Sequence, residues 1–177
     1  MKNIYIAVLI LIYLPSFGQT TKRLDDLNGF KEFKFGTLSK AYSSLQEKNI
    51  LHLKGVKQYK YIGSDYKYLY GVPIRYIIVS FFRDKLYSIS IYFGIDNSQY
   101  SLEQFILIKT NFETNFGSDY YGVEKTSQAN IVNGCIWEGQ KVRLEHVRIL
   151  DEYNYYAGYA MFYDKILEKQ QQLSELE

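Results

Sequence analysis

Cys135 and His146 are the two side chains whose types would allow a nucleophilic pair. Cys135 is the only cysteine of the chain, and His52 is the only other histidine. A thiolate activated by an imidazole is a common catalytic nucleophile. If Gly139-Gln140 is a two-residue hairpin loop, Cys135 lies diagonally across from His146, with about 7 to 8 Å between the Cα atoms. The apolar residues around them favour a buried thiol beside a core histidine, and a catalytic pair is the alternative.

Other catalytic and metal-binding signatures are missing. The sequence contains no H-E-x-x-H, no G-x-S-x-G and no glycine-rich phosphate-binding motif. Two histidines and one cysteine are few ligands for a zinc site. Asp151 and Glu152 are interpreted as a solvated hairpin tip, with a weak calcium site as the alternative, because one turn supplies too few oxygens for calcium. We therefore expect no cofactor.

Tyrosine is the unusual feature of the composition, with 19 residues. One interpretation is a sheet that uses tyrosine where other proteins use valine or threonine. The other is a recognition surface for sugars or proteins, because tyrosine presents a rigid ring with a polar tip. Several tyrosines alternate along the expected strands, so that each set lies on one side of its strand: Tyr59 and Tyr61; Tyr66, Tyr68 and Tyr70; Tyr155, Tyr159 and Tyr163.

The segment 74–93 is expected to form a β-hairpin that turns at Arg83-Asp84-Lys85. Strict alternation leaves both faces of its first strand largely apolar, and such a strand needs cover on both sides. The first two expected helices can cover one face, and the chain offers little for the other except curled strands, the terminal helix or a second molecule. We therefore predict that the other face borders a surface for a partner or ligand, formed by Arg75, Ile77, Phe81 and Tyr92.

The first 18 residues have the three parts of a secretory signal peptide. Lys2 is followed by an apolar run from Ile4 to Leu14, and the small residues Ser16 and Gly18 precede the expected cut. The run is shorter than the roughly 20 residues that span a bilayer. We expect cleavage after Gly18, a periplasmic or secreted protein, and no stable membrane anchor after cleavage. A formal net charge of +2 without long charge runs argues against nucleic acid as a partner.

The order of expected elements predicts an α+β fold of two α-β-β-β-β-like units, which form an antiparallel sheet with helices on one face. The predicted organisation is a polar segment over 19–29, a single α+β domain over 30–164, and a polar C-terminal helix or tail over 165–177. Ser101 and Gln104 form a capping box at the start of one helix. Helices are expected over 38–48, 101–117 and 164–177, and strands over 30–35, 56–62, 66–70, 74–82, 86–93, 122–127, 130–138, 141–150 and 155–163.

Two segments resemble small exported envelope domains of the BamE/SmpA and β-lactamase-inhibitor-protein-like types. Residues 35–45 are similar to the glycine and small polar residues that open a helix in those domains, and residues 79–89 to their strand, turn and strand. Together with the elements around them, these segments cover about a third of the chain. The chain lacks the lipid-bearing cysteine of BamE-type proteins. The resemblance implies an antiparallel sheet with helices on one face that acts by protein contacts.

Three functional hypotheses follow. The first is an exported, non-catalytic protein that binds an envelope or secreted protein, or a second copy of itself, as an inhibitor, immunity or assembly factor. The second is a small-ligand or glycan-binding domain with a tyrosine-rich sheet face, and the third is a hydrolase without a recognisable motif. A flat apolar patch would favour the first, an open aromatic groove the second, and a closed polar pocket with paired carboxylates the third.

Overall fold

The computed structural model describes residues 19–48, 52–94, 99–123, 130–150, 153 and 155–176. The predicted signal peptide and the pair Asp151 and Glu152 lie outside these residues. No helix in the described ranges is both long enough and apolar enough to cross a membrane.

The described elements combine three α-helices with a large sheet and a small hairpin. The helices are α2 (Gln19–Leu27), α3 (Leu102–Phe116) and α4 (Lys165–Ser174), and Ser39–Ala41 forms a 3-10 helix. The strands are β1 (Gly29–Phe30), β2 (Phe33–Lys34), β3 (Leu45–Glu47), β4 (Val56–Tyr61), β5 (Tyr68–Leu69), β6 (Val72–Phe82), β7 (Lys85–Phe93), β8 (Tyr121–Gly122), β9 (Ile131–Glu138), β10 (Val142–Leu150) and β11 (Tyr156–Asp164).

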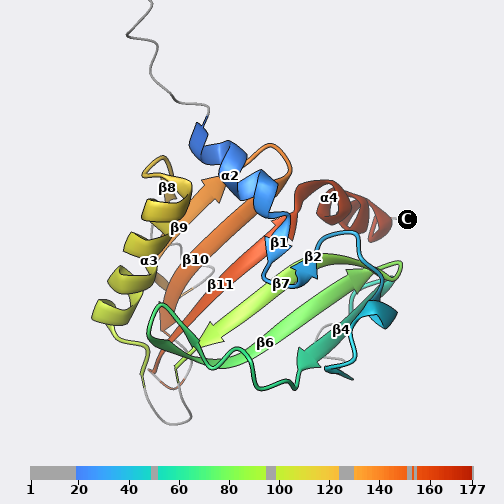
Figure 1. Ribbon diagram of the computed structural model, residues 1–177, viewed down its shortest axis with the longest axis horizontal. Coiled ribbons are helices and arrows are strands. Elements are labelled where there is room, and N and C mark those ends of the chain that lie inside the picture. Colours follow the sequence, from blue (N-terminus) through green and yellow to red (C-terminus); the bar gives the residue numbers. More distant parts are fainter. Residues whose placement is uncertain are drawn as a thin grey trace, which may run out of the picture.

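The main sheet has nine strands and is antiparallel throughout. Eight of the strands follow the order β3-β4-β6-β7-β11-β10-β9-β8 (Figure 1). The ninth, β5, is not part of this order and pairs with β6. Strands β1 and β2 form a separate two-stranded hairpin. The α+β class and the antiparallel sheet are thus as predicted. The two-unit arrangement is not seen.

The helix expected over 38–48 does not form. The chain makes only the 3-10 helix there and then enters β3. The Gly36 N–H donates to the Leu86 carbonyl at 2.9 Å, and the Leu86 N–H donates to the Thr37 carbonyl at 2.9 Å. Pairing with β7 therefore holds the start of this segment in an extended conformation, and tertiary contacts outweigh a weak local preference for helix.

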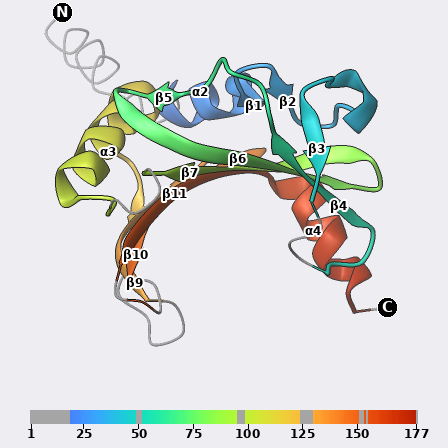
Figure 2. The same ribbon diagram turned by 90° about the horizontal axis from the view of Figure 1, so that it is seen from below.

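The sheet is strongly curved, and helices lie on both of its faces. Figure 2 shows α2, α3 and the β1-β2 hairpin on the convex side, and α4 on the concave side. Helix α4 contacts β7 and β11. The prediction that all helices cover one face is therefore wrong for α4. Asp164 caps this helix, because its side chain accepts hydrogen bonds from the N–H groups of Ile166 and Leu167.

The hydrophobic core lies between the convex face and α3. The predicted capping box of Ser101 and Gln104 is present at the start of α3, and Gly117 ends it at a positive φ of 88°. The sides of the helix that face the sheet bury Phe105, Ile108, Phe112 and Phe116. Since this core fills the convex side, the concave side is the face on which the sheet remains partly open.

Candidate functional site

The four residues predicted to border one surface do not share a face. Ile77 and Phe81 are each 1% exposed and belong to the hydrophobic core. Arg75 is exposed, and Tyr92 is half-buried on the concave face. The predicted surface is therefore wrong, because two of its members are buried by the protein's own chain.

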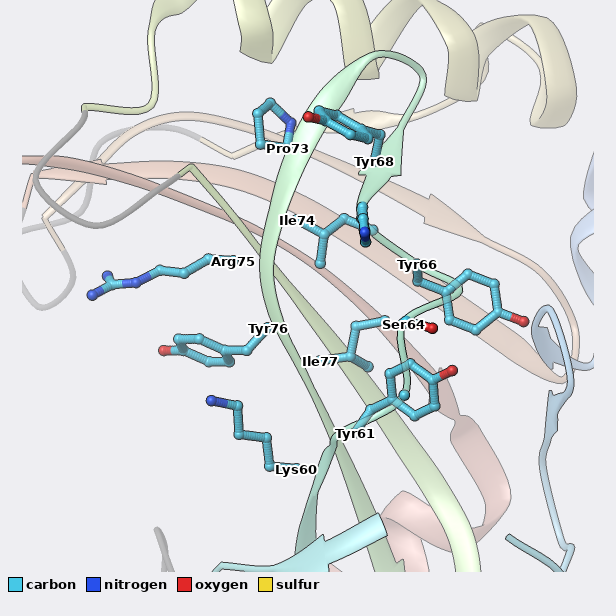
Figure 3. A pocket seen from close by; sticks show the side chains of 12 residues that line it. Lys60, Tyr61, Ser64, Tyr66, Tyr68, Pro73, Ile74, Arg75, Tyr76 and Ile77 are labelled. Carbon is cyan, nitrogen blue, oxygen red and sulfur yellow. The ribbon is translucent and has the colours of Figure 1, made fainter. Parts of the chain in front are cut away.

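A β-bulge in β6 explains why Arg75 does not lie on the core side with Ile77 and Phe81. Ile74 pairs with Phe93 and Tyr76 pairs with Tyr92, so that Arg75 is an extra residue in its strand. Arg75 and Tyr76 consequently point to the same side of β6, as Figure 3 shows. Bulges break the alternation of side chains and re-aim them. Beyond the bulge, Ile77 returns to the core side.

Three tyrosines lie in register on the concave face. Tyr76 of β6 pairs with Tyr92 of β7, which pairs with Tyr159 of β11. The ring centroids of Tyr76 and Tyr92 are 4.5 Å apart, and those of Tyr92 and Tyr159 are 6.0 Å apart. All three side chains are half-buried. We call these three residues the tyrosine ladder.

A cleft lined by both polar and apolar side chains continues from the ladder toward α4. It has a volume of about 360 Å³ and is lined by residues of the sheet and of α4. Gln58 and Ser80 are opposite each other in β4 and β6, and the Gln58 Nε2 donates to the Ser80 Oγ at 3.2 Å. Tyr92 lines the cleft and also belongs to the ladder. We call this space the α4 cleft. Its other polar lining residues are Tyr87, Ser88, Ser90, Tyr163, Glu168, Gln171 and Gln172.

A second pocket of about 290 Å³ lies at the other side of the ladder, beside β6 (Figure 3). Strand β4 pairs with β6 as far as Lys60 and Ile78, and β5 pairs with it again from Tyr68 and Pro73. Between these pairings, residues 75–77 have a strand partner on the β7 side only. The described lining contains several tyrosines, three basic side chains and no acidic one. We call it the basic pocket, after Lys60, Lys67 and Arg75.

Charged residues fasten α4 to the sheet. Arg143 of β10 contacts Glu145 at 3.0 Å and Glu168 of α4 at 2.6 Å. Lys165 of α4 contacts Glu138 of β9 at 2.8 Å. Burial raises the pKa of both Glu145 and Glu168, and Arg143 opposes this rise. Among the described residues that line the α4 cleft, Glu168 is the only carboxylate, so the cleft lacks the carboxylate pair that a hydrolase of this kind would use.

Cys135 and His146 lie directly opposite each other in β9 and β10. The predicted register is wrong by two residues, because Glu138 pairs with Arg143 and the hairpin loop is longer than two residues. Both side chains are buried. The His146 Nε2 lies 3.0 Å from the Tyr100 hydroxyl, and the His146 ring stacks on Phe105.

The surroundings of this pair make both groups neutral. Burial raises the pKa of the Cys135 thiol to about 11 and lowers the pKa of His146 to about 3. A thiolate–imidazolium pair would need a lowered pKa of the thiol and a raised pKa of the imidazole. The pair is therefore interpreted as part of the core. No group of three or more His, Cys, Asp or Glu side chains that would hold a metal ion occurs in the described part of the chain.

Ser64 and Lys67 were not expected to lie near a site, although their spacing matches S-x-x-K. Both line the basic pocket. They belong to the loop between β4 and β5, so no helical turn brings the lysine amine onto the face of the serine hydroxyl. The match alone therefore gives no reason to assign a serine nucleophile.

No family model, curated protein or solved structure matches this chain. The resemblance of residues 35–45 and 79–89 to small envelope domains stays a prediction. Its helix over the first segment is absent, as described above.

Proposed function

We propose that the protein is a non-catalytic binding protein that takes an oligosaccharide or a similar polyhydroxylated ligand on its concave face. The observation that carries this proposal is the tyrosine ladder, Tyr76, Tyr92 and Tyr159, in which Tyr92 also lines the α4 cleft and Tyr76 the basic pocket beside β6. Small-ligand sites combine aromatic surface with a few polar groups that fix the orientation. A sugar ring offers both an apolar C–H face and hydroxyl groups, which match this combination.

The polar residues beside the ladder support a hydroxyl-rich ligand. Serine, glutamine and tyrosine side chains both donate and accept hydrogen bonds, as sugar hydroxyls do. In the α4 cleft they come from three strands and from α4: Gln58, Ser80, Ser88, Ser90, Gln171 and Gln172. Three of these residues are small and buried: Ser80, Ser88 and Ser90. Because a serine side chain takes less space than a tyrosine, the concave face has more room for a ligand at these positions.

The protonation of the tyrosines supports binding and not chemistry. Burial raises the pKa of Tyr92, and burial with Glu145 nearby raises that of Tyr159 to about 12. Both phenols therefore stay neutral near pH 7 and serve as hydrogen-bond partners. A tyrosine that acts as a base would need a lowered pKa.

Calorimetric titration of the purified protein with a panel of soluble oligosaccharides tests the proposal. We expect one or more to bind, and the double variant Tyr92→Ala and Tyr159→Ala to weaken that binding by about tenfold or more. Tyr121→Ala is the matched control, because Tyr121 is exposed and lies on β8 at the far edge of the sheet. Failure of the whole panel, or equal losses in the control and the ladder variant, would refute the proposal.

A protein ligand, the first of the three hypotheses drawn from the sequence, is the second candidate for this face. The combination of tyrosine with serine favours it, since this pair is enriched in protein-recognition surfaces. The concave shape would then receive a protruding loop of an envelope or secreted protein. This candidate predicts that no saccharide binds, and that one purified protein partner binds the natural sequence and not the Tyr92→Ala, Tyr159→Ala variant.

A further inference from the structure

The ring of Tyr76 lies between two cationic side chains. The Lys60 Nζ is 5.6 Å from its centroid, and the Arg75 Cζ is 5.8 Å from it. Figure 3 shows all three side chains on the same side of β6, at the opening of the basic pocket. We call these three residues the cationic bracket. The bracket is continuous with the tyrosine ladder, because Tyr76 belongs to both.

The bulge of β6 creates this arrangement. In an unbroken strand, Arg75 and Tyr76 would point to opposite faces. Tyr76 keeps the register of the residues that follow it, and the extra residue places Arg75 on the same concave side, where Lys60 reaches them from β4. A bulge leaves one residue out of the ladder of backbone hydrogen bonds, and bulges are over-represented next to functional sites. Here it adds a positive charge to the face that carries the tyrosines.

Two carboxylates among the described residues accept hydrogen bonds from tyrosines that line the basic pocket. Tyr61 donates a hydrogen bond to Asp65 at 3.1 Å, and Tyr66 donates one to Glu32. Figure 3 shows Tyr61 and Tyr66 on the side of β6 opposite Arg75. Both carboxylates are thus engaged away from the bracket. The described lining of the basic pocket holds three cations and no carboxylate, which favours an anionic group.

We propose that the basic pocket binds the anionic group of the ligand, and that the ligand is an acidic saccharide whose neutral part lies along the tyrosine ladder. This inference rests on the proposed function and names its ligand class. A carboxylate or a sulfate on a sugar ring would contact Lys60 and Arg75, and Lys67 adds a third positive charge to the pocket.

A saccharide fits this face better than a nucleic acid does. The rings of Tyr76 and Tyr92 contact each other, with 4.5 Å between their centroids, so no nucleotide base fits between them. The positive charge is confined to one end of the face. Beyond the ladder, the next charged groups include the carboxylates of Glu145 and Glu168. A chain of phosphates running along the whole face would meet these carboxylates, whereas one charged sugar at the bracket would not.

Two matched ligands test the inference. The probes are a galacturonic acid hexamer and its fully methyl-esterified form, which have the same rings and linkages and differ in charge. Calorimetry at low ionic strength should show the acid binding about tenfold tighter than the ester, and added salt should reduce the difference. In the variant Lys60→Gln, Arg75→Gln the preference for the acid should disappear while the ester still binds.

The control variant is Lys57→Gln, Arg83→Gln, which also removes one lysine and one arginine charge, but outside the bracket. Lys57 pairs with Phe81 on the other face of β4, and Arg83 lies in the β6-β7 turn. It should keep the preference. Equal binding of acid and ester to the natural sequence would overturn this inference and leave the proposed function standing.

A second measurement separates the two proposals when neither hexamer binds. Titration with sodium sulfate, against chloride at equal ionic strength, should shift the amide NMR signals of Lys60 and residues 74–77 and leave that of Lys57 unchanged. If neither hexamer binds, such a shift would support the anion site in the basic pocket and its absence would refute that site, while the full oligosaccharide panel decides the proposed function. Tighter binding of a short single-stranded DNA than of the acidic hexamer would overturn the saccharide in favour of nucleic acid.

Discussion

Tyr76 and Tyr92 face each other across β6 and β7 on the concave face, with ring centroids 4.5 Å apart and the rings inclined by 33°. Tyr76 lies on this side because it continues the register in which Ile77 pairs with Ile91, and the bulge at Arg75 adds a cationic side chain beside it. The contact therefore belongs to the regular part of the sheet and lies next to the irregularity that places Arg75.

The two rings should stabilise each other measurably. A tilted aromatic pair contributes about 0.5–1.5 kcal/mol beyond the burial of its surface. A double-mutant cycle with Tyr76→Leu, Tyr92→Leu and both together should give a coupling energy in this range, as measured by urea unfolding. Leucine keeps most of the apolar contact with the sheet and removes the ring. Strictly additive effects would show that the rings are adjacent without interacting.

Asp25 of α2 should be a major anchor of the N-terminal helix. Its carboxylate accepts hydrogen bonds from the N–H groups of Gln140, at 2.8 Å, Lys141, at 2.8 Å, and Val142, at 2.9 Å, in the β9-β10 loop. Hydrogen bonds to a charged group contribute about 1.5–3 kcal/mol each when measured singly, and they are not additive. Asp25→Ala should therefore lower the free energy of unfolding by about 2–4 kcal/mol.

The neighbouring aspartate provides the control for this prediction. Asp26 belongs to the same helix and is exposed. Asp26→Ala should change the free energy of unfolding by about 0.5 kcal/mol or less. If both variants lose the same stability, helix propensity and not the loop contact accounts for the effect of Asp25.

The sequence predicts the long strands and α3 well because their signals are local and repeated. Ser101, Gln104 and Gly117 mark the ends of α3 by their own side-chain and backbone preferences. The turn at Arg83 and Asp84 forms where expected, and both residues have positive φ angles, of 48° and 64°. Stretches rich in apolar, β-branched or aromatic residues similarly predict β6, β7, β10 and β11.

The candidate site was harder to predict because it depends on interruptions of these patterns. Nothing in the sequence indicates that Arg75 is the extra residue of a bulge, since arginine and tyrosine occur equally well in regular strands. The Asp25 contact joins residues more than a hundred positions apart. Because the segment 19–29 is polar, the sequence predicts only a polar segment before the domain and not the helix α2. Of the tyrosines that alternate along the expected strands, only Tyr159 belongs to the ladder, because the ladder needs three strands in register.

Cys135 should influence stability and not ligand binding. Its thiol is buried and its pKa is raised to about 11, so little thiolate exists near neutral pH. Cys135→Ser places a hydroxyl in a mostly apolar site and should cost about 1–3 kcal/mol. Thiol labelling at mildly alkaline pH should be slow in the native protein and fast in urea. Rapid labelling of the native protein, or lost binding at unchanged stability, would assign Cys135 a chemical role.

His146 should make the protein less stable in mild acid. Its pKa is lowered by burial from 6.5 to about 3, so between these values the unfolded chain binds a proton that the native state excludes. Stability therefore falls as the pH decreases through this window, by up to about 1.4 kcal/mol per pH unit for one proton. Urea unfolding of the natural sequence and of His146→Gln, at several pH values between about 4 and 8, should show this slope only with the histidine.

His52→Gln provides the matched control, because His52 is the other histidine of the chain and is exposed. If His146→Gln fails to fold, the ring protons of His146 can be followed by NMR in the natural sequence, where they should not titrate above about pH 4. A normal titration near 6.5 would mean that the ring reaches water, and the core assignment of His146 beside Tyr100 and Phe105 would then be wrong.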